Sequence, residues 1–365
     1  MNGMLILTAL ISIVFTDAPA AEKAVPLMER QVLFADGQAG YARYRIPSLL
    51  VTKRGTVLAF AEGRKKTGSD WDDIDLALRR STDGGRTFSK IEFIADQGEL
   101  TMGNPCPIED RTTGIIWLLF CRGSKPGRGN AEVLVMKSTD DGQTWSKPVD
   151  ITPSAKDATW PFVGTGPGHG IQLKSGRLLI PCWADGTQKI GEIQFSFCIY
   201  SDDHGQSWQL GGSTLKDFVN ECCIAELENG DVLLNMRNYA PEKRTRQIAM
   251  STDGGITWSE QWHDDVLIEP ICQASLISIP DVKNHLLFSN PASRDSRTNM
   301  TIRHSTDGGR TWAFSRTLHP GFSEYSSLVV LPDHTIGCLY EYGKKKRNEH
   351  LMLTRFDIDW IKEGR

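Results

Sequence analysis

Ser305-Thr-Asp-Gly-Gly-Arg-Thr-Trp312 is an octapeptide that recurs along this chain of 365 residues. Four near-copies share the pattern Ser-x-Asp-x-Gly-x-x-(Trp/Phe), at Ser81–Phe88, Ser138–Trp145, Ser201–Trp208 and Ser251–Trp258. Consecutive copies start 50 to 63 residues apart, a period typical of repeat architectures such as β-propellers and solenoids. One copy would mean little, because Asp-Gly turns are common, but five copies with the aromatic residue in register indicate a repeat.

The chemistry of the octapeptide predicts a hairpin turn. Ser and Asp side chains can bond the backbone a few residues further on, and Gly adopts positive φ without steric cost. The closing Trp or Phe is large and apolar, and we expect it to pack between neighbouring sheets.

The segment before each copy contains three runs of β-branched and apolar residues, the third of which leads into the octapeptide. In the first unit these runs are Ser48–Thr52, Thr56–Ala61 and Ile74–Arg80. Helical periodicity is not sustained anywhere. Each unit is therefore predicted to be a four-stranded antiparallel blade, with the octapeptide as its third turn.

The chain ends are predicted to pair with each other. The C-terminal segment supplies three further strands, Ser327–Leu331, Thr335–Tyr340 and Leu351–Phe356. The run Arg30–Phe34 can supply the fourth, which removes open sheet edges. We therefore expect an all-β, six-bladed β-propeller in a single domain, residues 21–365.

Composition excludes some partners. The net charge of −4 argues against nucleic acid or an anionic membrane surface as the main partner. A small anionic ligand stays compatible, because arginines can cluster locally in an acidic protein. The hydrophobic fraction of 39% and the charged fraction of 24% are ordinary for a soluble globular protein.

The N-terminus predicts an export signal, residues 1–20, cleaved after Ala20. Met4–Phe15 is apolar but too short to span a membrane, and Ala18-Pro-Ala20 resembles a cleavage site. The stretch before the apolar run carries no Lys or Arg, so a disordered or membrane-tethered leader is the alternative. An export signal implies a secreted or periplasmic protein.

The eight cysteines lack the dense spacing of a small disulfide scaffold, and several lie in apolar runs. Most are predicted to be reduced core residues. Adjacent Cys222 and Cys223 should point to opposite faces of a strand. No Cys/His spacing matches a zinc site, and no metal or other cofactor is expected.

The repeat also predicts which polar residues share one mouth of the ring. If the octapeptide turns lie at the bottom, the starts of the first strands and the connections after the second strands lie at the top. Polar residues at these top positions are Arg45, Arg64, Asp70, Glu221, Arg237, Arg297, Tyr325 and Glu341. The choice of these eight over neighbouring polar residues rests partly on a family resemblance.

Several further segments carry this resemblance: Tyr44-Arg-Ile-Pro47, Phe60-Ala-Glu-Gly-Arg64, Gly103-Asn-Pro-Cys-Pro107, Thr165-Gly-Pro-Gly-His169, Asn220-Glu-Cys222, Leu234-Asn-Met-Arg-Asn-Tyr239, Glu324-Tyr-Ser326 and Leu339-Tyr-Glu341. Across essentially the whole mature chain, the sequence resembles the exo-sialidases (neuraminidases) of the bacterial and animal cytosolic type. Octapeptides of this kind, called Asp boxes, also occur in non-catalytic propellers. The Arg-Ile-Pro segment and the Glu221–Arg237 and Tyr325–Glu341 pairs, each 16 residues apart, are more specific.

The resemblance implies a binding site for sialic acid. Arg45, Arg237 and Arg297 would bind the substrate carboxylate, for which planar, permanently charged guanidiniums are well suited. Glu341 would orient Arg45, and Arg64 would lie beside the sugar ring near its C4 substituent.

The resemblance also implies three catalytic residues. Tyr325 would be the nucleophile, since a neutral phenol avoids the repulsion that a carboxylate nucleophile would meet from the substrate carboxylate. Glu221 would take its proton, and Asp70 would be the general acid/base. Tyrosine is the recognised nucleophile of sialidases among glycosidases.

Asp70 has three rivals within five residues: Asp72, Asp73 and Asp75. It is preferred because its spacing of six residues from Arg64 matches the loop of the family.

Other assignments also have alternatives. Arg294 and Arg303 are rivals of Arg297, although Arg303 falls in a third strand near the bottom turn. Glu221 and Arg237 could instead be a structural ion pair. Tyr325 could be an ordinary core tyrosine with a satisfied hydroxyl.

The sequence leaves other parts of the site open. Met102, Asn104 and Phe162 could line an apolar N-acetyl pocket or pack in the core. Trp160-Pro-Phe-Val-Gly164 replaces an aromatic-rich stretch of the family, so linkage preference is undecided. His169, flanked by glycine, is interpreted as structural.

We therefore predict a retaining exo-α-sialidase that is metal-free and acts on terminal sialic acid of sialylated glycans. The alternative from another class is a non-catalytic propeller lectin that uses the same mouth. Among enzymes, the alternatives are a trans-sialidase and a hydrolase for a related nonulosonic acid.

Overall fold

The computed structural model describes residues 27–364, except 124–130, 187–192, 216–217 and 241. Its helices are short: α1 (Thr152–Ala155), α2 (Ile358–Lys362) and the 3-10 turn η1 (Gln38–Gly40). The predicted all-β class is confirmed. None of the described helices is long and apolar enough to cross a membrane. The predicted export signal, residues 1–20, lies outside the described residues.

The strands form four sheets. The first contains β2 (Arg43–Val51), β3 (Val57–Arg64), β4 (Ile74–Ser81), β5 (Glu92–Ala95), β6 (Thr101–Asp110), β7 (Ile115–Gly123), β8 (Glu132–Ser138) and β9 (Val149–Asp150). The second contains β10 (Phe162–Thr165), β11 (Ile171–Gln172), β12 (Leu178–Asp185), β13 (Gln194–Ser201) and β14 (Gln209–Ser213). The third contains β15 (Val219–Glu226), β16 (Val232–Asn238), β17 (Thr245–Ser251) and β18 (Trp262–Ile268). The fourth contains β19 (Ser275–Ser278), β20 (Leu286–Pro291), β21 (Thr298–Ser305), β22 (Phe314–Val330), β23 (Ile336–Gly343), β24 (His350–Phe356) and β1 (Met28–Ala35).

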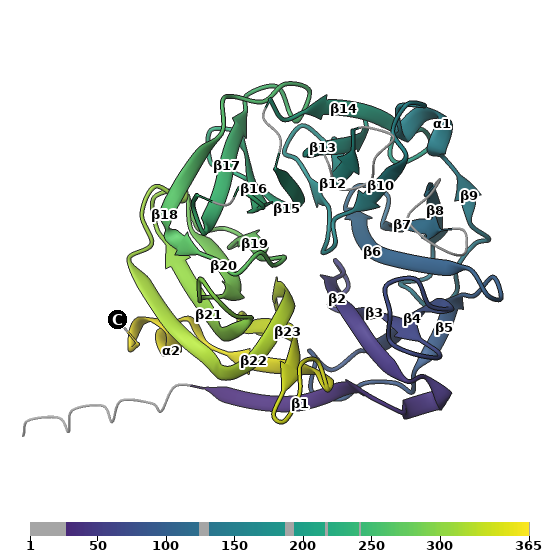
Figure 1. Ribbon diagram of the computed structural model, residues 1–365, viewed down its shortest axis with the longest axis horizontal. Helices are drawn as coiled ribbons and strands as arrows, with labels where there is room; N and C mark the ends of the chain where they lie inside the picture. The colour runs from purple at the N-terminus through teal and green to yellow at the C-terminus, as the bar shows by residue number, and fades with distance from the viewer. Residues whose placement is uncertain (1–26, 124–130, 187–192, 216–217, 241, 365) are drawn as a thin grey trace, which may run out of the picture.

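Two of these sheets consist of two antiparallel parts that are joined to each other. In the first sheet, one parallel pair, Ile74↔Thr101, links β4 to β6. In the fourth sheet, the long strand β22 pairs with β21 through its first half and with β23 through its second half. Figure 1 shows the sheets arranged around a common centre, with β2, β6, β15 and β19 nearest to it. The first strand of a repeat unit can therefore supply residues that meet at the centre.

The chain ends pair as predicted. β1 is antiparallel to β24, from Met28↔Phe356 to Ala35↔His350. Helix α2 follows β24 directly, and the carboxylate of Asp357 caps it by accepting from the N–H of Trp360 at 2.7 Å. The N-terminal strand thus covers an edge that would otherwise be open.

Each octapeptide lies between the third and fourth strands of a unit, as predicted: β4–β5, β8–β9, β13–β14, β17–β18 and β21–β22. In the last copy, the carboxylate of Asp307 accepts from Ser305 Oγ at 2.8 Å and from the N–H of Thr311 at 2.9 Å. Gly308 and Gly309 have φ of 76° and 83°, which an L side chain rarely adopts. The turn therefore needs both the Asp side chain and the glycines.

The closing aromatic residues pack against neighbouring units. Trp208 is 2% exposed and meets Trp117 of β7 edge-on, with ring centroids 6.2 Å apart. Trp145 meets Phe60 of β3 in the same way at 5.9 Å. The prediction for these residues is confirmed, and the contacts join successive units around the centre.

The cysteines also lie as predicted. All eight are free and buried. Cys222 packs in one core cluster with Leu234, whereas Cys223 packs in another with Phe288. The adjacent pair therefore points to opposite faces of β15.

The octapeptides should make stability depend on pH. Burial acts to raise the pKa of Asp253, but hydrogen bonds from Thr257 and Ser251 outweigh it and lower this pKa to about 2. This stabilisation is present above the unfolded pKa near 4 and is lost as pH falls towards 2. Asp253→Asn should reduce the free energy of unfolding by about 1 kcal/mol at pH 7, and the difference from wild type should shrink between about pH 4 and pH 2.

Urea unfolding followed at several pH values measures this difference. Glu260→Gln is the matched control, because Glu260 is exposed two residues after the same octapeptide. Equal loss of stability in both variants, or a loss in Asp253→Asn that does not vary with pH, would contradict the assignment.

Candidate functional site

A cavity of about 170 Å³ lies on the side of the sheets opposite the octapeptide turns. It is at the ends of the first strands of the repeat units. The register of β3 with β4 fixes this polarity, because Val57 pairs with Ser81 at the octapeptide end and Arg64 pairs with Ile74 at the other. Seven of the eight predicted site residues line the cavity: Arg45, Arg64, Asp70, Glu221, Arg237, Arg297 and Tyr325. The eighth, Glu341, is fully buried and contacts Arg45.

Three of these residues lie where a first strand breaks its register. The pairing shifts between Arg45 and Ser48 in β2, between Val219 and Cys222 in β15, and between Ser323 and Ser326 in β22. Arg45, Glu221 and Tyr325 fall within or at the edge of these irregular segments. Such β-bulges re-aim side chains, so the bulges turn these three towards the centre.

Tyr325, Glu221 and Arg237 form a hydrogen-bonded group in the cavity wall. Tyr325 Oη donates to Glu221 Oε1 at 2.5 Å, and Arg237 Nη1 donates to Tyr325 Oη at 3.0 Å. Arg237 Nη1 also pairs with Glu221 Oε2, and Arg237 Nη2 donates to Tyr239 Oη at 2.5 Å. The Tyr325 hydroxyl thus has a carboxylate acceptor for its proton and a cation at its oxygen.

Burial and the neighbouring Glu221 carboxylate raise the pKa of Tyr325 well above its usual value of 10, although Arg237 and Arg297 act in the opposite direction. The phenol is therefore neutral at any ordinary pH, and its proton can leave only to a base held beside it. Glu221 is in the position to be that base.

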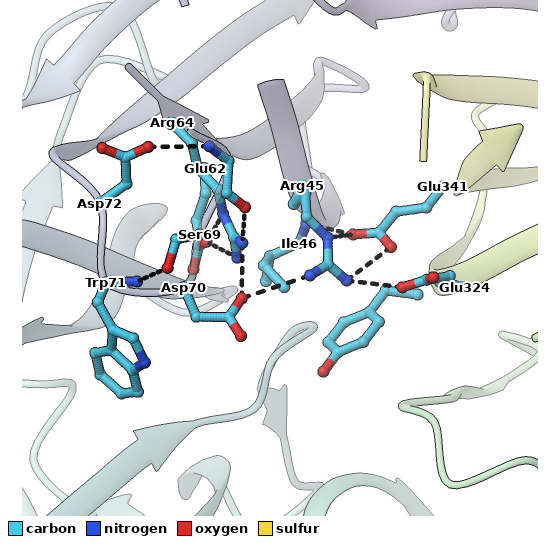
Figure 2. Close-up of polar contacts among 12 residues, drawn as sticks. Arg45, Ile46, Glu62, Arg64, Ser69, Asp70, Trp71, Asp72, Glu324 and Glu341 are labelled. Carbon is cyan, nitrogen blue, oxygen red and sulfur yellow. Dashed lines mark hydrogen bonds and ion pairs between the residues drawn. The ribbon is translucent and has the colours of Figure 1, made fainter. Parts of the chain in front are cut away.

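Arg45 is surrounded by carboxylates (Figure 2). Its Nε and Nη2 donate to the two oxygens of Glu341 at 3.0 and 3.1 Å, and Nη2 also donates to Glu324 at 2.9 Å. Asp70 lies 3.4 Å from Nη1. Burial alone would lower the pKa of Arg45, but Glu341 and Glu324 outweigh it and raise this pKa further above its usual value. The guanidinium is consequently held in one orientation and stays charged.

Arg297 is the arginine that reaches the cavity, and its rivals do not line it. Arg297 Nη1 donates to Glu324 Oε2 and Nη2 donates to the carbonyl of Ile271, both at 2.9 Å. Arg294 Nη1 instead donates to the carbonyl of Arg244 at the surface, and Arg303 bonds Asn290 within the fourth sheet. Glu324 therefore bridges Arg45 and Arg297 through one oxygen.

Asp70 is the only one of the four clustered aspartates that lines the cavity. Its Oδ1 accepts from Arg64 Nη1 at 2.6 Å, and its side chain is 64% exposed (Figure 2). Asp72 instead accepts from the backbone N–H groups of the loop at Thr67 and Gly68. Asp70, and not Asp72, therefore reaches the cavity.

The two remaining rivals serve a different contact. Asp73 and Asp75 both pair with Lys65, at 3.2 and 2.7 Å. Asp75 also accepts from the hydroxyl of Tyr41. Neither carboxylate is directed into the cavity.

The sequence left Met102, Asn104 and Phe162 open between an apolar pocket and the core, and the structure divides them. Asn104 and Phe162 line the cavity, together with Trp71 and Trp183. Met102 does not: it is fully buried and packs in the core between β3, β4 and β7, so the core alternative holds for this residue. Met102 and Asn104 have the same parity along β6 up to its register shift, but the bulge between Gly103 and Cys106 sends them to different surroundings.

Three residues with clear contacts in the site were given no role from the sequence. Glu62 Oε2 holds Arg64 at 2.7 Å, and Glu324 bridges two arginines. Tyr239 accepts from Arg237. The available signal was spacing: Glu62 with Arg64 and Tyr239 with Arg237 are two apart on a strand or its end, which places them on one face. Glu324 carried no such signal, because a residue next to Tyr325 normally faces the other side.

Comparisons with known proteins identify the family of this chain. A family model described as a BNR repeat-like domain matches residues 55–338. A protein named sialidase from Micromonospora viridifaciens is 37% identical over 94% of this chain, and one from Bacteroides fragilis is 34% identical over 84%. The chain belongs to the sialidase family. It spans 56% and 61% of the length of these two relatives.

A solved sialidase structure has the same fold as this chain. The structure titled Hadza microbial sialidase Hz136 is 31% identical, with a TM-score of 0.83, over 91% of this chain and 69% of that one. The likeness extends over the sheets that carry the cavity, rather than over the octapeptides alone.

His169 lies away from the cavity, as interpreted from the sequence. It contributes to a second, larger cavity of about 620 Å³, which also touches Leu49 and Glu226 near the far ends of β2 and β15. Burial lowers the pKa of His169 to about 4, so the imidazole is neutral near pH 7. The interpretation of His169 as a structural residue stays a prediction.

The contact between Arg45 and Glu341 should contribute to stability. Glu341→Gln removes the buried charge opposite Arg45 and one acceptor oxygen, so the free energy of unfolding should fall by about 2 kcal/mol. Urea unfolding measures it, with Glu363→Gln at the end of α2 as an exposed control. An unchanged unfolding midpoint for Glu341→Gln would show that Glu324 alone suffices to hold the guanidinium.

Proposed function

We propose that this chain is a retaining exo-α-sialidase that hydrolyses terminal sialic acid from glycoconjugates. The observation that carries the proposal is the hydrogen bond from Tyr325 to Glu221 inside a cavity that four arginines also line. Membership of the sialidase family supports it. Sialylated glycoproteins, glycolipids and oligosaccharides are the proposed substrates.

The three arginines Arg45, Arg237 and Arg297 are the proposed partners of the substrate carboxylate. Guanidiniums offer forked donors that match a carboxylate, and they keep their charge at every working pH. Because this carboxylate is attached to the reacting carbon, its fixation also positions the reaction centre. Glu341 would orient Arg45, and Arg64 would lie beside the sugar ring.

Tyr325 is the proposed nucleophile. In the first step its Oη forms a bond to the anomeric carbon, its proton passes to Glu221, and the glycosidic bond breaks. Asp70 donates the proton that the leaving oxygen takes up. Tyrosine in place of a carboxylate is the known exception that sialidases make among glycosidases.

Water completes the reaction in the second step. Asp70, now a carboxylate, takes a proton from water as the water oxygen attacks the anomeric carbon. The bond to Tyr325 breaks, and the phenolic oxygen recovers its proton from Glu221. Two inversions give net retention. The high exposure of the Asp70 side chain supports its access both to the leaving group and to water.

We further propose that the four sheets together make a six-bladed β-propeller, residues 21–365. The support is that β22 and the β4–β6 link divide the two largest sheets into four-stranded antiparallel parts. Export through the segment 1–20, with a secreted or periplasmic location, is also a proposal. The apolar run Met4–Phe15 and the small residues after it support this proposal.

The first test is turnover of 4-methylumbelliferyl α-sialoside by wild type and Tyr325→Phe. Wild type should release the fluorophore, and NMR should detect α-sialic acid as the first anomer. Because Phe lacks the nucleophilic oxygen, Tyr325→Phe should lower kcat by about 10² or more. Folded wild type that binds sialosides without turnover would indicate a lectin, and β-anomer as the first product would exclude the double displacement.

A pair of arginine variants tests the carboxylate site. Arg297→Ala should raise KM for the sialoside by about tenfold or more, because it removes a charge-assisted contact to the substrate. Arg294→Ala is the matched control, since Arg294 lies three residues away and donates to the carbonyl of Arg244 at the surface. Equal effects of the two substitutions on KM would contradict the assignment of Arg297.

A further inference from the structure

A buried ion pair between Arg246 and Glu269 contacts the backbone beside two of the cavity arginines. Both side chains are 0% exposed, and Arg246 Nη1 donates to Glu269 Oε2 at 2.9 Å. Neither residue lines the cavity. A buried ion pair is often no more stabilising than apolar residues of similar size. Overall stability is therefore a weak explanation for this pair.

Glu269 holds the backbone next to Arg237. Its Oε1 accepts from the N–H of Asn238, the residue after Arg237, at 2.6 Å. The pairing of β16 with β17 ends at Met236↔Gln247, so no β17 partner pairs with Asn238. The carboxylate takes the place of a neighbouring strand at the end of β16, next to Arg237.

The same pair holds the turn that contacts Arg297. Glu269 Oε2 accepts from the N–H of Cys272 at 3.2 Å, and Arg246 Nη1 donates to the carbonyl of Cys272 at 2.7 Å. The preceding residue, Ile271, has φ of 55°, a conformation that β-branched residues adopt only when their surroundings impose it. The Ile271 carbonyl accepts from Arg297 Nη2. The two hydrogen bonds to the backbone of Cys272 therefore fix the direction of this carbonyl.

We propose that Glu269 and Arg246 are positioning residues that set Arg237 and Arg297 in register with each other. The proposal rests on the proposed function, because it takes these two arginines to share the substrate carboxylate. Arg237 belongs to β16 of the third sheet, whereas Arg297 directly precedes β21 of the fourth. Two donors on separate sheets can share one carboxylate only if their relative positions are fixed, since displacements of about 1 Å can cost a factor of about 10² in rate.

Glu269→Gln tests the proposal with nearly unchanged shape. The glutamate oxygens accept from three donors, on Asn238, Arg246 and Cys272. A glutamine must turn its NH₂ group towards one side of this set, so at least one donor faces another donor. Either the backbone beside Arg237 or the turn beside Arg297 should then shift.

The measurement is the preference for a charged ligand over its neutral counterpart. Isothermal titration calorimetry gives Kd for an unreactive 2,3-unsaturated sialic acid analogue and for its methyl ester. Wild type should prefer the free carboxylate, and Glu269→Gln should lower this preference by about tenfold or more. The affinity for the ester should change much less, a split that general destabilisation would not produce.

Two further variants complete the experiment. Arg246→Lys keeps a charge opposite Glu269 but loses the planar group whose Nε and Nη2 donate to Asn235 and so fix the direction of Nη1 towards Glu269 and the Cys272 carbonyl. Arg246→Lys should also lower the preference for the carboxylate over the ester. It tests the positioning role if Glu269→Gln does not fold. Arg355→Met is the control, because Arg355 is a largely buried cation that pairs with Glu29 and Asp333 where the chain ends meet. It should lower Tm and leave the preference unchanged.

The outcomes separate this proposal from the function on which it rests. If wild type does not prefer the carboxylate to the ester, the carboxylate site and the positioning role both fail. If wild type prefers the carboxylate and the folded Glu269→Gln and Arg246→Lys variants keep that preference, only the positioning role is overturned. A drop in preference in Arg355→Met as large as in Glu269→Gln would also overturn it.

Discussion

The central constraint on this molecule is that guanidiniums at the bottom of a cavity need carboxylates around them. A charge removed from water is costly unless it is paired and hydrogen-bonded. Glu341 and Glu324 satisfy this need for Arg45, and Glu324 also serves Arg297. Glu221 does the same for Arg237. The carboxylates keep the arginines charged and hold them in place.

The β-bulges explain how strand residues become site residues. A regular strand alternates its side chains between two faces, so neighbours such as Glu324 and Tyr325 would point apart. The register shift between Ser323 and Ser326 removes this alternation, and both side chains contact the same group of arginines. Local irregularity in the first strands therefore supports the site, while the octapeptide turns at the far end keep the sheets regular.

Much of this site could be predicted because its residues repeat a position in the chain. The octapeptides mark one end of every unit. The end of a second strand then places Arg237 at the other end, and the start of a first strand places Tyr325 there as well. The sequence did not decide the surroundings of residues where the bulges intervene. Met102 was open between pocket and core and is in the core, and Glu324 was given no role although it bridges two arginines.

The choice of residues at one mouth rested partly on the family resemblance, whereas the sequence by itself determined the all-β class, the positions of the turns and the pairing of the chain ends. These follow from local chemistry and period, which a linear chain displays directly. Only the tertiary structure decided that Arg297 rather than Arg294 reaches the cavity, and that Asp70 rather than Asp72 does. It also revealed the pair Arg246–Glu269. These choices depend on contacts between segments distant in sequence, or on which way a loop folds, and no local pattern encodes them.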